Sequence, residues 1–76
     1  FIMNDKRQRF ERVAGNRVQA IIEKLDSLAK CSNKNNYSYS EQDVKKMFIA
    51  IKAALKRTET RFEDELKKYN KHRFEF

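Results

Sequence analysis

A polar stretch from Cys31 to Ser40, CSNKNNYSYS, constrains the fold more than any other part of this chain. It holds three asparagines and three serines, whose short side chains hydrogen-bond nearby backbone and therefore favour turns and helix caps. The chain has no proline and one glycine, and 38% of its residues are charged, a composition typical of helices rather than sheet. The stretch therefore indicates a loop, residues 31–40, between two helices.

The second helix is predicted to begin directly after Ser40. Asp43 follows this serine by three residues, and an apolar run opens at Val44, which is the order of a capping box. In that motif the serine hydroxyl accepts a hydrogen bond from a free backbone N–H. Acidic residues in the first turn also suit the helix dipole. This pattern predicts a boundary and says nothing about function.

Helical periodicity before the loop predicts a helix over about residues 5–30. Asn4 or Asp5 is the candidate N-cap. Gly15 weakens the pattern, because glycine costs about 1 kcal/mol relative to alanine inside a helix. Gly15 marks a kink or a close helix crossing, or with Asn16 it ends a shorter helix. The apolar positions, three or four residues apart, are Phe10, Ala14, Val18, Ile21, Leu25 and Leu28.

After the loop, a near-heptad pattern predicts a helix over about residues 41–70, followed by a frayed tail, residues 71–76. The seam residues are Val44, Phe48, Ile51, Leu55, Thr58, Phe62, Leu66 and Tyr69. Pairs of opposite charge at i,i+4 spacing support the same helix. These pairs are Glu41–Lys45, Glu63–Lys67 and Asp64–Lys68.

The two helices predict an all-α fold, a single helical-hairpin domain of residues 1–76 with two long antiparallel helices. With one cysteine the chain has no internal disulfide, and a 76-residue chain of this kind often needs a partner subunit. Apolar residues beside the seams favour a homodimer that closes into a four-helix bundle. The alternative is a monomer with scattered surface apolar residues. The residues beside the seams are Ile22, Ala29, Met47, Ile49 and Ala54.

Catalytic, cofactor and metal motifs are missing from the sequence. One histidine, His72, supports no Ser–His or Cys–His dyad, and with Cys31 it is too little for a structural zinc site. We therefore expect no enzymatic activity, no cofactor and no metal. No apolar run approaches the ~20 residues that span a bilayer, and the first residues have no signal-peptide core. No membrane partner is therefore expected, and the free thiol of Cys31 fits a reducing, intracellular compartment.

The formal charge of +7, from 18 basic and 11 acidic residues, makes phosphate backbones and acidic protein surfaces eligible partners. Lys45, Lys46 and Lys56 have acidic neighbours three or four residues away. Five other cations have none, so their charge is not neutralised locally. The predicted nucleic-acid or acidic-surface contacts are therefore Arg12, Arg17, Lys24, Lys52 and Arg57. The same residues are equally typical of ordinary solvated helix flanks.

Two tyrosines in the loop, Tyr37 and Tyr39, lie close to Lys34 and the asparagines. Aromatic residues in such a setting stack on bases or anchor a protein partner. Lys34, Tyr37 and Tyr39 are therefore the predicted partner-binding loop. In the simpler interpretation, one tyrosine plugs the open end of the hairpin and the other lies on the surface.

The segment from Arg17 to Phe62 resembles a small helical protein family that recurs in phages and conjugative elements of Gram-positive bacteria. The resemblance lies in an Arg-Val helix, a Cys-Ser-Asn-Lys-x-Asn-Tyr-x-Tyr loop and a helix that ends at Arg-Phe. It implies a cytoplasmic accessory protein of a mobile element, and no site residue carries over from it. Small basic proteins of such elements often bind nucleic acid, or inhibit a host or defence protein.

The predicted function is therefore a non-enzymatic basic binding module that acts on nucleic acid or a nucleoprotein. The alternative is a protein-directed adaptor or inhibitor, for example an anti-CRISPR protein, that works through a bundle surface and the Tyr37/Tyr39 loop. A third possibility is a purely structural dimer within a larger assembly.

Overall fold

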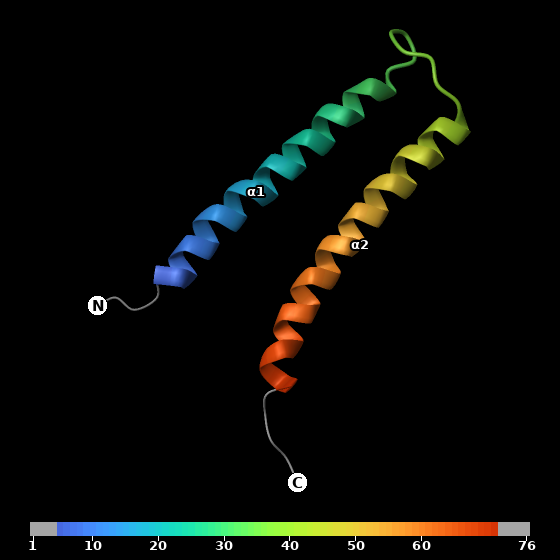
Figure 1. Cartoon of the computed structure of the whole chain (residues 1–76). Helices are drawn as coiled ribbons and strands as arrows, with labels where there is room; N and C mark the ends of the chain where they lie inside the picture. Colours follow the sequence, from blue (N-terminus) through green and yellow to red (C-terminus); the bar gives the residue numbers. More distant parts are fainter. Residues whose placement is uncertain (1–4, 72–76) are drawn as a thin grey trace. The chain divides into compact units, whose positions relative to one another are not determined.

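The computed structural model describes residues 5–71 of the chain, with side chains for residues 5–68 (Figure 1). It contains two long helices, α1 (Asp5–Ala29) and α2 (Glu41–Lys71), and a short 3₁₀-helix, η1 (Lys30–Ser32). No strand occurs within the described range. The predicted all-α class is thus confirmed. The chain divides between Ser38 and Tyr39 into two units, one built on each long helix.

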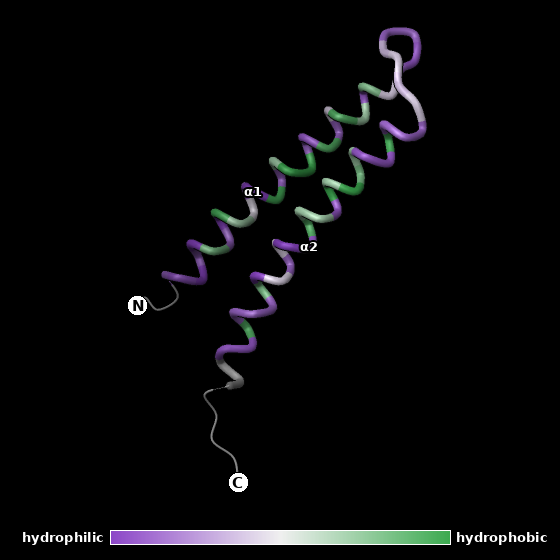
Figure 2. The backbone as a smooth tube through the Cα atoms, turned by 45° about the vertical axis from the view of Figure 1, so that its right-hand side comes forward, coloured by the Kyte–Doolittle hydropathy of each residue, from purple (hydrophilic) through white to green (hydrophobic). Residues whose placement is uncertain are grey.

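Helix α1 runs for 25 residues without interruption, and Gly15 lies inside it. The alternative in which Gly15 and Asn16 end a shorter helix is therefore wrong. Polar and apolar residues alternate along α1 with the helical period (Figure 2). Ala14 and Leu28 of the apolar stripe are half-buried, as is Val13 outside it, and the other members of the stripe are exposed.

Replacing Gly15 with alanine is expected to stabilise the protein by about 0.5–1 kcal/mol. A Cβ atom at this position meets no other atom within 4 Å, so the methyl group adds no clash. Alanine also loses less backbone entropy when the helix forms. Urea unfolding followed by circular dichroism at 222 nm measures the change. Ala14→Gly is the matched control and should destabilise the protein by a similar amount; a destabilising Gly15→Ala would mean that another chain packs against this glycine.

The chain leaves α1 through η1 and a turn organised by Asn33. The Asn33 side-chain Oδ1 accepts a hydrogen bond from the Asn35 backbone N–H at 2.9 Å. The Asn33 carbonyl accepts two more, from the N–H groups of Asn36 at 3.1 Å and Tyr37 at 3.0 Å. An asparagine side chain that bonds the backbone two residues on is an Asx-turn. The expectation that the asparagines direct a turn is therefore confirmed.

Helix α2 begins with the predicted capping box. The Asp43 N–H donates to the Ser40 Oγ at 3.2 Å, and the Ser40 N–H donates to the Asp43 Oδ2 at 2.9 Å. The Ser40 carbonyl accepts the first intrahelical bond, from Val44 at 3.2 Å, which identifies Ser40 as the N-cap. Tyr39 and Val44, both half-buried, occupy the two positions of a hydrophobic staple. Four neighbouring residues thus fix where α2 starts.

Along its 31 residues, α2 presents an apolar stripe formed by Val44, Phe48, Ile51, Leu55, Thr58, Phe62 and Leu66. Ile51 and Val44 are half-buried, whereas Leu55 and Leu66 have 58% and 68% of their surface exposed. Ile49 lies off the stripe and is 69% exposed. Among the residues that the structure describes, none is fully buried. Each helix therefore carries an apolar stripe that another surface has to cover, because a single helix cannot bury its own stripe.

Some predictions fall outside the described residues. These are the N-cap candidate Asn4 and the part of the tail from His72 to Phe76. Lys71, predicted to belong to the tail, is the last residue of α2. Over the described residues, neither helix combines the length and apolarity needed to cross a bilayer. The antiparallel packing of the helices and the four-helix dimer stay predictions.

Candidate cationic surfaces

On α1, the predicted cations occupy two different faces. Arg17 and Lys24 are seven residues apart, so they lie on one flank of the helix about 10 Å apart along its axis. Arg12 lies on a different face, away from the apolar stripe. All three side chains are exposed, and within the described part of the chain none forms an ion pair. Arg17 and Lys24 thus form one local pair of available charges.

On α2, Lys52 and Arg57 also point to different sides, because five residues along a helix correspond to a rotation of about 140°. Lys52 lies on one flank of the apolar stripe. Arg57 lies across the helix, near Arg61. Both are exposed and neither has an acidic partner within residues 5–68. The five predicted cations are therefore spread over four helical faces rather than gathered at one site.

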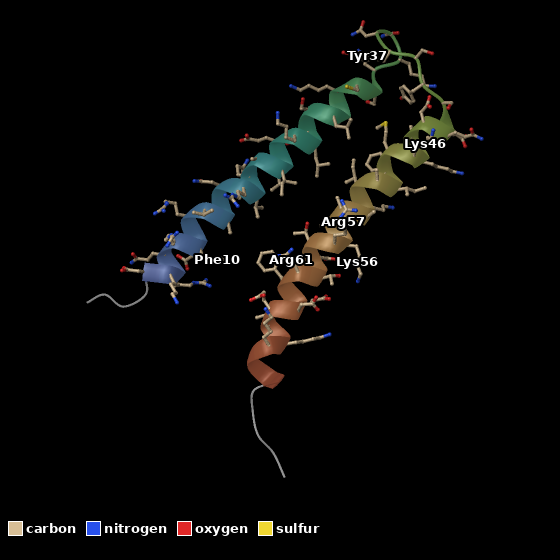
Figure 3. All side chains as sticks on the ribbon, in the orientation of Figure 1. Phe10, Tyr37, Lys46, Lys56, Arg57 and Arg61 are labelled. Atoms are coloured by element: carbon tan, nitrogen blue, oxygen red, sulfur yellow. The ribbon has the colours of Figure 1, made fainter. Side chains whose placement is uncertain are left out.

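Sequence reasoning missed three further available cations, Lys45, Lys46 and Lys56. Their acidic neighbours suggested local neutralisation, yet no ion pair to any of them is found in the described residues. The signal that identifies them is the carboxylate distribution: from Val44 to Thr58 the chain has no Asp or Glu. We call residues 44–58 the cationic segment of α2. Its basic residues are Lys45, Lys46, Lys52, Lys56 and Arg57. Figure 3 labels three of them, Lys46, Lys56 and Arg57.

The next two turns have the opposite charge. Glu59, Glu63, Asp64 and Glu65 follow the cationic segment, with Arg61 as the basic residue among them. The Lys68 Nζ donates to the Glu65 Oε2 at 2.9 Å. This hydrogen bond, together with the charges of Lys68 and Arg61, holds the pKa of the Glu65 carboxyl below its ordinary value. Lys68 thus pairs with Glu65 at i,i+3 and not with Asp64, the predicted i,i+4 partner.

Replacing Lys68 with glutamine should raise the pKa of Glu65 toward its ordinary value, because the main hydrogen bond and nearest cation are lost. A carboxyl whose pKa is lowered by folding stabilises the helix above its unfolded pKa, and this contribution disappears as the pH falls through the lowered pKa. The variant should therefore lose less stability on acidification. Carboxyl NMR titration measures the shift, with Lys67→Gln as the control; identical Glu65 titrations in the wild type and Lys68→Gln would contradict the assignment.

The first turns of α1 hold a local charge cluster. The Arg7 Nε donates to the Glu11 Oε2 at 2.8 Å, and the Arg7 guanidinium carbon lies 5.7 Å from the centre of the Phe10 ring. That distance is within the range of a cation–π interaction. Arg7 is therefore less available to an external anion than Arg17 or Lys24.

The predicted loop surface is divided between its two tyrosines. Tyr37 is 52% exposed, whereas Tyr39 is half-buried at the start of α2. Lys34 is exposed in the turn that Asn33 organises. The loop thus presents one aromatic ring to solvent rather than a pair. Tyr39 instead belongs to the hydrophobic staple at the start of α2.

The described helices offer exposed charged side chains to a partner. Among the described residues, no three of the His, Cys, Asp and Glu side chains lie where they could hold a metal ion together. Cys31 is a free, exposed thiol. Lysine and arginine side chains without ion pairs are suited to bind phosphate and carboxylate groups. No known protein family, curated protein or solved structure matches this chain.

Proposed function

We propose that this chain is a non-enzymatic binding module for nucleic acid or a nucleoprotein. The observation that supports the proposal is the set of exposed cations without ion pairs: Arg12, Arg17 and Lys24 on α1, and the cationic segment on α2. Such charges favour phosphate backbones, because each contact releases condensed counterions.

The dimensions of α2 suit this role. The cationic segment is about 21 Å long at 1.5 Å per residue. A duplex presents phosphates along a comparable length in about six base pairs. Basic residues project from both flanks of the segment, so one flank can contact phosphates while the apolar stripe stays covered. Contacts of this kind position a protein on nucleic acid without reading its sequence.

A salt titration tests the proposal. Affinity for mixed-sequence duplex DNA, single-stranded DNA and RNA is measured by fluorescence anisotropy between about 50 and 200 mM salt. We expect affinity to fall by about tenfold to a thousandfold over this range, as phosphate contacts require. An absence of binding at 50 mM salt, or binding that salt does not change, would exclude the proposal.

The helices are proposed to form an antiparallel hairpin that dimerises into a four-helix bundle. The exposed apolar stripes of α1 and α2 support this arrangement, since both have to be covered. The resemblance to proteins of mobile elements supports an accessory role in the cytoplasm of a bacterial host. Light scattering gives the mass of the protein in solution, and a monomeric mass at high protein concentration would exclude the bundle.

The alternative is a protein-directed adaptor or inhibitor. It is favoured by Tyr37, a 52% exposed aromatic side chain on a hydrogen-bonded turn. Aromatic anchors of this kind often dominate protein interfaces. Replacing Tyr37 with alanine should then abolish capture of the partner and leave helicity unchanged. Unchanged capture would exclude the loop as the contact.

A further inference from the structure

We propose that α2 pairs in an antiparallel manner with α2 of a second copy of this chain. The proposal goes beyond nucleic-acid binding, and it identifies which helix makes the dimer contact and in which direction. Two features of α2 support it: the order of apolar residues along the stripe and the order of charges along one flank. Each feature matches the same feature on a second copy of α2 that runs in the opposite direction.

The apolar stripe matches its own reverse about a two-fold axis between Lys56 and Arg57. In an antiparallel pair, each residue then lies level with the residue equally far on the other side of this point. Ile51 lies level with Phe62 of the second copy, and Leu55 lies level with Thr58 of the second copy. Phe48 and Leu66 lie on the same face of one helix, five helical turns apart. In the pair, Phe48 of one copy is level with Leu66 of the second copy to within about 1.5 Å. Six apolar layers result, because every contact occurs twice.

Thr58 is compatible with this seam because its hydroxyl is already satisfied. The Thr58 Oγ1 donates to the Ala54 carbonyl at 2.9 Å, within α2. A threonine that bonds the preceding turn in this way leaves no free donor to bury, and it presents its methyl group to a neighbour. Thr58 therefore fits opposite Leu55, where an unpaired hydroxyl would be costly.

The flank beside the stripe supplies the direction. Lys52, Lys56, Glu59 and Glu63 all lie on this flank, lysines first and glutamates second. In an antiparallel pair the same flank of both helices lies on the same side. Lys52 is then within about 3 Å, along the axis, of the levels of Glu59 and Glu63 of the second copy, and Lys56 is equally near the level of Glu59. These three Lys–Glu pairs each occur twice, against one like-charge approach, because Lys56 lies within about 1.5 Å of the level of Lys56 of the second copy.

A parallel pair is less complementary. It would set this flank against the other flank of the partner, where Met47, Ala54, Arg61 and Glu65 lie nearest the stripe. Lys52 and Lys56 would then lie level with Ala54 and have no carboxylate within reach, and only Glu59 and Glu63 would lie near a cation, Arg61. The antiparallel pair also gives Lys52 and Lys56 carboxylate partners, so the cations left for phosphate contacts in the dimer are Arg12, Arg17, Lys24, Lys45, Lys46 and Arg57.

Two complementary variants test the proposal without nucleic acid. The variant K52E/K56E makes these four flank positions all acidic, and E59K/E63K makes them all basic. We expect each to raise the dissociation constant of the dimer by about tenfold or more at low salt, because several close pairs become repulsive. An equimolar mixture of the two should regain the dimer mass. Analytical ultracentrifugation gives the masses, and circular dichroism checks that both variants are helical.

The control variant K30E/K46E has the same charge change away from this flank and should dimerise like the wild type. Direction is read from spin labels on Glu41→Cys in a Cys31→Ser background. An antiparallel pair separates the two labels by about 45 Å, and a parallel pair by about 10 Å. The proposal is overturned by a monomeric wild type, by single variants that dimerise normally, by a mixture that stays monomeric, or by the shorter distance. None of these results bears on nucleic-acid binding.

Discussion

Replacing Arg17 and Lys24 together with glutamine is expected to weaken binding to duplex DNA about tenfold at 100 mM salt. Both side chains are exposed on one flank of α1, and neither has an ion pair in the described residues. Each lost phosphate contact should reduce the slope of log affinity against log salt by close to one. The double variant should therefore show a slope smaller by about two, measured by the same anisotropy titration.

The matched control removes two charges that are already engaged. Arg7→Gln with Lys68→Gln has the same change in net charge, but Arg7 pairs with Glu11, and Lys68 pairs with Glu65. We expect this control to change affinity less than threefold and to keep the wild-type slope. Equal losses of affinity in the two double variants would mean that only the net charge determines binding. Arg17 and Lys24 would then not be specific phosphate contacts.

Replacing Ile51 with aspartate is expected to destabilise the fold by about 3 kcal/mol or more, enough to unfold a small domain. Ile51 lies in the middle of the apolar stripe of α2 and is half-buried in the isolated chain. If a second helix covers the stripe, the variant places an unpaired carboxylate in an apolar contact, which is strongly unfavourable. Thermal unfolding followed by circular dichroism measures the loss.

Ile49→Asp is the control for this variant. It is the same substitution in the same helix two residues away, so helix propensity and charge change in the same way. Ile49 is 69% exposed and lies off the stripe, and its replacement should shift the midpoint by only a few degrees. Equal losses at the two positions would show that the stripe of α2 is not the covered face.

Local sequence signals predicted the ends and the course of the helices well. Ser40 and Asp43 specify the start of α2 because both partners of the capping box lie within four residues. Gly15 interrupts the helical pattern of α1, but the apolar stripe on both sides of it maintains one helix, since a single glycine costs less than the neighbouring turns contribute. Such signals are short-range, and a sequence expresses them completely.

The candidate surface was only partly predictable, because neighbour spacing does not decide whether a side chain pairs. Lys45 and Lys56 have carboxylates at suitable spacing and still form no ion pair in the described residues. Lys68 pairs with Glu65 rather than with Asp64. Exposed pairs gain little energy and lose side-chain entropy, so small differences in geometry select the partner. What covers each apolar stripe depends on distant groups or a second chain, which periodicity alone does not encode.

Because Ser40 and Asp43 hydrogen-bond each other, the position at which α2 starts does not depend on the length of the loop before it. Both bonds, and the Asn33 turn, are completed by residues at most four positions apart. Between Tyr37 and Tyr39 the chain can therefore gain residues without moving either the turn or the cap, and loop closure makes each doubling of length cost only about 0.6 kcal/mol. Ser38 is accordingly the position at which an insertion, such as an epitope tag or a fluorophore attachment site, should be tolerated best.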